Sequence, residues 1–422
     1  MVNRRNFLKG SAASLLVLAG SGKLKADGQA RQNIVEDKKL EKLLKEIKPF
    51  GPDDYAQRLS KAQRLLRENK LSAFFVEPGP TMQYFTGVNW WRSERTFGFL
   101  LFPDKAPVWV CSAFELDRAR ELISPEQEIR TWEENESPFA LIGKTVKDYG
   151  RETRLALEPS TRSFIIYGLK REASHLELVD GSVISESCRG IKSEQEILCL
   201  EAANRITKIA YREAFKKIRE GMSPQELANF ISEEHARFGV NGSGGPSFGR
   251  ASSFPHGSRQ RKNLALGDVI LVDGGCRVEG YSSDVTRTIV FGRPTDEQKK
   301  IWEIVRKAQK AALKACRPGA TCEEVDRAAR KIIEEAGYGP GYRFFSHRLG
   351  HGIGLEGHEY PYLVQGNTLK IQPGMTFSNE PGIYLTGKYG IRIEDCMVVT
   401  ENGARMLGGL EAQSIEEPFA AD

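Results

Sequence analysis

Four carboxylates occur where the chain otherwise has the pattern of buried β-strands, and this feature strongly limits the folds available to it. They end or interrupt apolar runs such as VILVD and GIRIED, and they are Asp273, Asp284, Glu380 and Glu394. A buried carboxylate without a partner is strongly unfavourable, so each must reach the surface, pair with a base or hold a metal ion. A strand end or a salt bridge would explain a single one. Four that converge are better explained as ligands of a shared metal site.

A glycine-rich segment adds a histidine to this set. Residues 347–358 read H-R-L-G-H-G-I-G-L-E-G-H and contain three of the six histidines in the chain, with glycine on both sides of His351. Glycine lets the backbone pass close to a site. A lone histidine would more often be structural, whereas three within twelve residues favour a functional group.

The chain is long enough for two domains. Its 422 residues exceed the roughly 250 to 300 residues at which one hydrophobic core usually stops growing. Residues 27–50 are highly charged with leucines at helical spacing, which predicts a linker helix packed on the body. Alternating helical and β-rich runs predict an α/β domain over residues 51–188. Residues 189–422 begin with helices and become rich in glycine and β-formers, which predicts an α+β domain with a curved antiparallel sheet. Within this domain, Ser223-Pro-Gln-Glu226 predicts a capping box, and the strand pattern of Gly267–Asp273 predicts a turn at Gly274-Gly275.

Residues 1–26 have the pattern of a targeting segment. Arg4 and Arg5 stand in N-R-R-N-F-L-K, before a short apolar run from Ser11 to Gly20 that cannot span a bilayer. The segment resembles a twin-arginine signal peptide, which implies the twin-arginine export machinery as a partner and a periplasmic or other extracytoplasmic location. An ordinary basic leader would also mean export. The twin-arginine route carries folded proteins, so a metal site could be loaded before export.

Composition excludes several other classes. The formal net charge is +5 and basic residues are interleaved with acidic ones, so nucleic acid is not an expected partner. After the leader no segment predicts a transmembrane helix. The seven cysteines form no C-x-x-C pair, which argues against a zinc knot or a dense disulfide framework and favours small core residues.

The five candidate ligands stand in motifs that resemble a known family. These motifs are D-G-G, S-D-V-T-R-T, G-H-G-I-G, N-E-P-G-I-Y and R-I-E-D. In this order they resemble the pita-bread metallopeptidases, which include methionine aminopeptidase, aminopeptidase P and prolidase. The resemblance is strong over residues 191–405 and looser in the first domain, where residues 84–87 read Y-F-T-G. It implies a pita-bread catalytic domain, its curved sheet covered by helices, after a smaller α/β domain of the creatinase/prolidase type. The additional first domain favours the proline-specific branch.

The resemblance also implies a role for each ligand. Asp273 would bind one ion, Asp284 and Glu394 would bridge two, and His351 with Glu380 would complete the second site. Two divalent ions about 3.5 to 4 Å apart share a water molecule and generate hydroxide as the nucleophile. Glu380 would also shuttle a proton to the leaving nitrogen. Manganese or cobalt is the expected metal, with iron or zinc as alternatives that affinity order does not exclude.

The same resemblance assigns residues around the ions. His256 and His358 would contact the substrate carbonyl and stabilise the developing charge, and His347 would line the pocket for the proline ring. Arg392 would orient the bridging carboxylates. For each histidine the alternative is a satisfied buried hydrogen bond, and for Arg392 it is a surface charge on a strand.

The expected substrates are peptides with proline in the second position. An Xaa-Pro amide has no N–H, and a metal pair that acts on the carbonyl does not need one. The prolidase branch often has H-E-x-P-R where this chain reads H358-E-Y-P-Y362. That arginine can hold a dipeptide's carboxylate, so Tyr362 favours an Xaa-Pro aminopeptidase, with an Xaa-Pro dipeptidase as the alternative.

The family resemblance also leaves three alternative functions to consider. A metal-dependent lyase is weakly disfavoured, and a creatine amidinohydrolase is disfavoured because those enzymes do not keep the ligands. A binding module without catalysis is disfavoured for the same reason. A homodimer is expected from the resemblance.

Overall fold

The computed structural model describes residues 37–259 and 262–420, all of which belong to one compact unit, Val35–Asp422. The expected leader, residues 1–26, and the first part of the linker lie outside the described residues. What is described of the linker contains α1 (Lys38–Glu46), which begins at the N-cap Asp37, buries Leu40 and packs on a later helix, α8. Among the described residues no helix is long and apolar enough to cross a membrane.

The first part of this unit is built on a mixed six-stranded sheet in the order β4-β3-β2-β1-β5-β6. The strands are β1 (Ala73–Val76), β2 (Gly98–Phe102), β3 (Lys105–Ser112), β4 (Ile129–Trp132), β5 (Arg154–Leu157) and β6 (Glu177–Asp180). Around them lie α2 (Pro52–Glu68), α3 (Pro80–Thr86), α4 (Leu116–Leu122), α5 (Pro138–Tyr149), α6 (Ser163–Glu172) and α7 (Ser182–Arg189). Every residue of β1 and β2 is buried, as expected for a sheet covered on both faces. This is the expected α/β arrangement.

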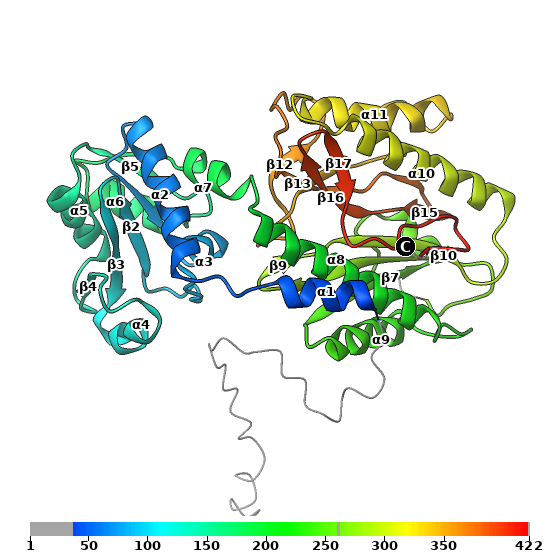
Figure 1. Ribbon diagram of the computed structural model, residues 1–422, viewed down its shortest axis with the longest axis horizontal. Coiled ribbons are helices and arrows are strands. Elements are labelled where there is room, and N and C mark those ends of the chain that lie inside the picture. The colour runs from blue at the N-terminus through cyan, green and yellow to red at the C-terminus, as the bar shows by residue number, and fades with distance from the viewer. Residues whose placement is uncertain (1–36, 260–261, 421–422) are drawn as a thin grey trace, which may run out of the picture. The chain divides into compact units, whose positions relative to one another are not determined.

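The second part places helices on both sides of antiparallel sheets (Figure 1). The helices are α8 (Glu194–Phe215), α9 (Pro224–Arg237), α10 (Asp296–Ala315) and α11 (Cys322–Glu335), and each begins with a capping box. The Ser223–Glu226 box expected from the sequence is among them. Helices α8 and α9 pack on one sheet, and α10 and α11 pack on the other. The α+β fold with a helix-covered antiparallel sheet is therefore confirmed.

Two sheets of this second part bring the ligand motifs together. The first has the order β10-β8-β7, formed by β7 (Gly242–Phe248), β8 (Val269–Val278) and β10 (Val285–Val290), with β9 (Tyr281–Ser282) on β8. The second has the order β12-β11-β13-β16-β17, formed by β11 (Gly350–Gly352), β12 (Glu359–Leu363), β13 (Thr376–Asn379), β16 (Asp395–Thr400) and β17 (Gly403–Met406). A hairpin of β14 (Gly382–Leu385) and β15 (Tyr389–Arg392) completes the region. A bridge between Thr286 and Glu394 joins the two sheets.

One local prediction was wrong. We expected a turn at Gly274-Gly275, but β8 continues through both glycines to Val278, and the chain turns at Glu279-Gly280. The two glycines serve close packing instead, because a Cβ on Gly275 would lie 2.0 Å from the Ser283 carbonyl oxygen. Gly274 has a φ of +154°, which side-chain-bearing residues rarely adopt.

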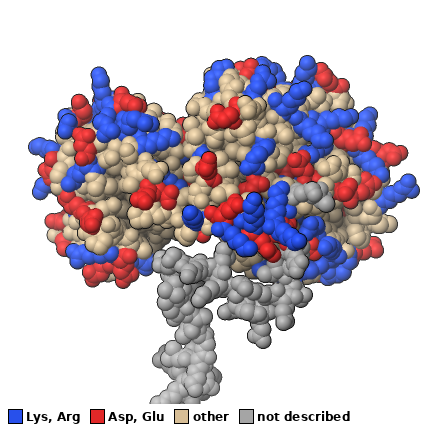
Figure 2. All heavy atoms as spheres, in the orientation of Figure 1, with Lys and Arg blue, Asp and Glu red and all other residues tan. Residues whose placement is uncertain are grey.

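Charged side chains of both signs are spread over the surface that Figure 2 shows. All seven cysteines are free and buried, as expected for small core residues. Burial raises the pKa of Cys111 to about 12.

Candidate metal centre

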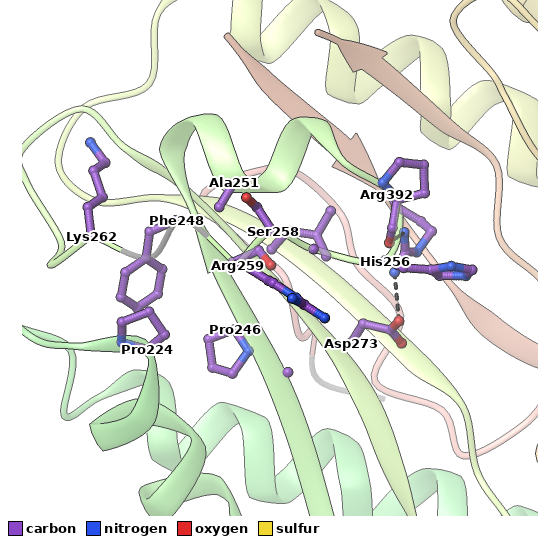
Figure 3. Close-up of a pocket in the computed structure, with 15 residues that line it drawn as sticks. Pro224, Pro246, Phe248, Ala251, His256, Ser258, Arg259, Lys262, Asp273 and Arg392 are labelled. Carbon is purple, nitrogen blue, oxygen red and sulfur yellow. Dashed lines mark hydrogen bonds and ion pairs between the residues drawn. The ribbon is translucent and has the colours of Figure 1, made fainter. Parts of the chain in front are cut away.

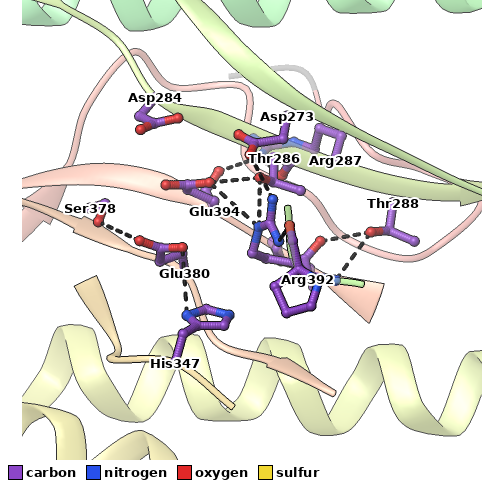
Figure 4. Close-up of polar contacts among 12 residues, drawn as sticks. Asp273, Asp284, Thr286, Arg287, Thr288, His347, Ser378, Glu380, Arg392 and Glu394 are labelled. Atoms are coloured by element: carbon purple, nitrogen blue, oxygen red, sulfur yellow. Dashed lines mark hydrogen bonds and ion pairs between the residues drawn. The ribbon is translucent and has the colours of Figure 1, made fainter. Parts of the chain in front are cut away.

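The five predicted ligands come from separate elements that end at one place. Asp273 lies in β8 and Asp284 directly precedes β10, so both belong to the first sheet. His351 lies in β11, Glu380 directly follows β13, and Glu394 lies between β15 and β16. Figure 4 shows the four carboxylates gathered close together. The structure thus brings together all five residues that the sequence singled out.

Beside a group of Asp284, His351 and His358, the potential ligand atoms form two overlapping groups that contain predicted ligands alone. One consists of Asp273, Asp284 and Glu394, and the other of His351, Glu380 and Glu394, with the atoms of each group within 4.8 Å of one another. Glu394 belongs to both. His351 Nε2 lies 3.2 Å from Glu380 Oε1 and 3.7 Å from Asp284 Oδ2. This spacing suits two neighbouring cations that share carboxylates.

The electrostatics of the site favour the binding of cations. Burial and repulsion from neighbouring carboxylates raise the pKa values of Asp284 and Glu394 well above their usual range. Burial opposes ionisation of Glu380 too, but the hydrogen bond from His351 and nearby positive charge lower its pKa to about 2. Four carboxylates and one imidazole, crowded in this way, fit hard or borderline divalent ions.

Arg392 is buried beside the ligands and is not a surface charge. Its Nη2 donates to Asp273 Oδ2 at 2.7 Å, and its Nε donates to Thr286 Oγ1 at 3.0 Å. Nε also lies 3.8 Å from Glu394 Oε2. One guanidinium therefore contacts a ligand from each sheet, which favours the orienting role over the alternative of a strand-surface charge.

Hydroxyl groups hold the ligands as well, and the sequence reasoning missed them. Thr286 donates to Glu394 at 2.6 Å, and Ser378 donates to Glu380 at 3.1 Å. Tyr384 OH accepts a hydrogen bond from Arg392 at 2.9 Å and lies 2.8 Å from His347 Nε2. Each lies within two to four residues of a ligand in a quoted motif, and this proximity was the only signal in the sequence.

The three predicted substrate histidines surround the ligands at different depths. His358 is exposed, and its ring stacks on His351 with centroids 3.6 Å apart. His347 lies 3.9 Å from Glu380, and burial lowers its pKa. His256 lines a cavity of about 600 Å³ that also contains Asp273 and Arg392. Figure 3 shows His256 beside both of these residues.

Comparisons with known proteins agree with this geometry. Residues 198–401 match the model of metallopeptidase family M24, and residues 58–191 match the creatinase/prolidase N-terminal domain. The chain is 36% identical over 352 residues to the Xaa-Pro dipeptidase of Lactobacillus helveticus, covering 82% of this chain and 95% of that one. The chain therefore belongs to metallopeptidase family M24, whose members use divalent metal ions.

Two solved structures are similar over nearly their whole lengths. Dipeptidase PepE from Mycobacterium ulcerans is 30% identical with a TM-score of 0.80, and the match covers 85% of this chain and 96% of that one. X-Pro aminopeptidase from Thermotoga maritima is also 30% identical, with a TM-score of 0.68 and coverage of 82% and 98%. The fold is thus similar to that of a dipeptidase and to that of an X-Pro aminopeptidase.

Proposed function

We propose that this metallopeptidase is an Xaa-Pro dipeptidase. The observation that carries the proposal is the similarity to a protein named Xaa-Pro dipeptidase over 95% of its length, together with five converging ligands. This favours the alternative from the sequence over the aminopeptidase that Tyr362 had suggested. The Xaa-Pro aminopeptidase is the second candidate, because Tyr362 carries no charge and the Thermotoga maritima structure is similar as well.

The proposed cofactor is a pair of divalent ions, with manganese as the first choice. Asp273, Asp284 and Glu394 would hold one ion, and His351, Glu380 and Glu394 the other, in agreement with the two groups of ligand atoms. When bound, such a pair polarises the scissile carbonyl and supplies a hydroxide nucleophile near neutral pH. Asp284 lies 3.7 Å from His351, close enough to bridge both positions as the resemblance implies.

Residues of the chain would guide the protons and the substrate. Glu380 is the proposed proton shuttle, because its carboxylate lies among the ligands, 3.2 Å from His351 Nε2 and within hydrogen-bond distance of Ser378. Partial desolvation and the neighbouring His351 lower the pKa of His358, so at neutral pH it offers an uncharged imidazole to the substrate carbonyl. His347, fixed between Tyr384 and the Arg348 carbonyl, forms a wall for the proline ring. His256 would approach from the cavity side.

The test compares substrate lengths. The manganese-loaded chain from residue 27 onward is assayed for alanine release from Ala-Pro and from Ala-Pro-Ala-Ala, with Asp284→Ala as the control. Cleavage of Ala-Pro alone, lost in the control, supports the dipeptidase. Preferred cleavage of the tetrapeptide would replace it with the aminopeptidase, and no cleavage by a protein with two bound ions would point to a lyase.

Export and assembly are proposals of the same kind. The twin-arginine route rests on residues 1–26, outside the described part of the chain, and predicts that Arg4→Lys with Arg5→Lys retains the protein in the cytoplasm. The homodimer rests on family resemblance and is tested by light scattering.

A further inference from the structure

Arg348 places a positive charge without an ion-pair partner among the described residues beside the candidate metal centre. It precedes His351 by three residues and is exposed. Its guanidinium carbon lies 4.4 Å from the centroid of the Tyr362 ring. Within the described part of the chain its guanidinium makes no ion pair and donates no hydrogen bond to a protein group. The aromatic face stabilises the position of the cation while its N–H donors stay available.

The strand register places Tyr362 on the face of the metal centre. His351 in β11 is paired directly with Tyr362 in β12. Side chains of directly paired residues lie on the same face of a sheet. The His351 ring faces Asp284 and Glu380 and stacks on His358, so Tyr362 lies on the face where substrate would bind. Arg348 shares that region, because its guanidinium lies over the Tyr362 ring.

The other cations near the ligands are already engaged. Arg392 donates to Asp273, Thr286, Tyr384 and the Pro255 carbonyl. Arg189 and Lys192 pair with Glu359 at 2.6 Å each. Arg259 lines the large cavity from an exposed loop, without an aromatic platform. Among these described cations near the ligands, Arg348 is therefore the one that both lies on an aromatic ring and makes no ion pair.

We infer that Arg348, supported by Tyr362, binds the terminal carboxylate of an Xaa-Pro dipeptide and thereby sets substrate length. This inference rests on the proposed dipeptidase function and deepens it. A planar guanidinium can donate two parallel hydrogen bonds to a carboxylate, and it does so from its edge while its face remains on the ring. Tyr362 thus contributes a platform for a cation that comes from the segment just before β11. A longer peptide has no carboxylate at this position and loses the contact.

The test compares Ala-Pro with alanyl-prolinamide, which differ only in the negative charge. Steady-state kinetics are measured with manganese-loaded wild type, Arg348→Gln and Arg348→Lys. We expect Arg348→Gln to lower kcat/KM for Ala-Pro by roughly 10- to 100-fold, mainly through KM, because a charge-assisted contact is lost. Cleavage of the amide should change less than about threefold, and Arg348→Lys should restore part of the difference. Arg343→Gln is the matched control, since Arg343 also lies over an aromatic ring, that of Phe344.

Inhibition by free proline and by prolinamide gives a readout separate from turnover. Arg348→Gln should weaken inhibition by proline and leave that by prolinamide unchanged. The inference would be overturned if Arg348→Gln still bound proline more tightly than prolinamide, or if Arg259→Gln lost this difference instead. Neither result would contradict the proposed dipeptidase function. A wild type that cleaves the amide and Ala-Pro-Ala-Ala as well as Ala-Pro would overturn both, and the wild-type data alone would show this.

Discussion

At the scale of single residues, the site depends on where charge is placed. Arg392, at the end of β15, donates hydrogen bonds to Asp273 and Thr286 of the first sheet, and Thr286 in turn donates to Glu394. The ligands are thus fixed by a buried cation and by hydroxyls before any metal binds. Such groups orient ligands and commonly affect metal affinity or activity by 10- to 100-fold.

Arg392→Lys should therefore retain the fold and lose function. A lysine ammonium cannot contact Asp273 and Thr286 at the same time, because it lacks the planar fork of arginine. We expect metal affinity or kcat/KM to fall by about 10- to 100-fold. The measurements are metal stoichiometry after dialysis and steady-state kinetics. Arg405→Lys is the control, because Arg405 is half-exposed and pairs with Glu201 away from the ligands. Full activity in Arg392→Lys would contradict the orienting role.

His235 should make stability depend on pH. It is fully buried, and burial lowers its pKa to about 4 from an ordinary 6.5. Between these values the unfolded chain binds a proton that the folded chain excludes, so stability falls as pH falls through this window. The shift corresponds to about 3 kcal/mol, fully present above pH 6.5. Urea unfolding at pH 7 and pH 4 should show a smaller loss in His235→Gln than in wild type. Equal losses would exclude this origin.

The sequence indicated the ligands well and their supporting residues poorly, for a physical reason. An acid in an apolar strand is conspicuous because it is costly to bury. Thr286 and Ser378 are ordinary strand residues, and only the tertiary structure turns their hydroxyls toward Glu394 and Glu380. Arg348 was likewise indistinguishable from a surface charge until the pairing of β11 with β12 placed Tyr362 under it.

At the scale of elements, one helix connects two of the ligand-bearing segments. Gln309 of α10 is fully buried, and its Nε2 donates to the Asn379 and Ile393 carbonyls and to Asp395. Asn379 returns a hydrogen bond to the Gln309 carbonyl at 3.0 Å. Asn379 directly precedes Glu380, and Ile393 and Asp395 flank Glu394. The helix thus fixes the spacing between two predicted ligands.

Gln309→Leu should destabilise the protein and disturb the site. The change leaves buried acceptors without a donor, at an expected cost of about 2–4 kcal/mol. Denaturant unfolding measures the stability, and metal stoichiometry reports the spacing of Glu380 and Glu394. Lys310→Leu, on the exposed side of the same helix, is the control for any effect of leucine on helix propensity. A stability within about 0.5 kcal/mol of wild type would show that the connection is dispensable.

The helices were easier to predict than the sheets. Capping signals such as Ser223-Pro-Gln-Glu226 are local, so the sequence indicated α9 correctly. Strand pairing is less local, because β13 pairs with β16 and the bridge between Thr286 and Glu394 joins the two sheets. No short sequence pattern encodes these contacts. The predicted turn at Gly274-Gly275 was wrong because glycine marks close backbone approach as well as turns.

At the scale of the whole molecule, repulsion within the site links metal to stability. Burial and repulsion from neighbouring carboxylates raise the pKa values of Asp284 and Glu394, so keeping both groups ionised in the metal-free fold is unfavourable. Divalent ions bound only to the folded state stabilise it by mass action.

Chelation should therefore lower the melting temperature. The expected stabilisation is about 3–4 kcal/mol at metal concentrations 100 to 1,000 times the Kd. Calorimetry with and without chelator measures it. Asp284→Asn should melt higher than wild type without metal, because one repelling charge is gone, and should gain less from manganese. An identical melting temperature with and without chelator would contradict the link.

The seven buried thiols carry a consequence for where the protein can mature. None is paired, and burial holds the pKa values of Cys199, Cys316 and Cys322 near 12, so almost no thiolate is available for exchange. The folded protein should therefore take up no glutathione from oxidised glutathione, as measured by its intact mass. A fold that needs no disulfide bonds and keeps its thiols buried does not depend on the redox potential around it. Such a polypeptide can fold on the reducing side of a membrane and function on the oxidising side.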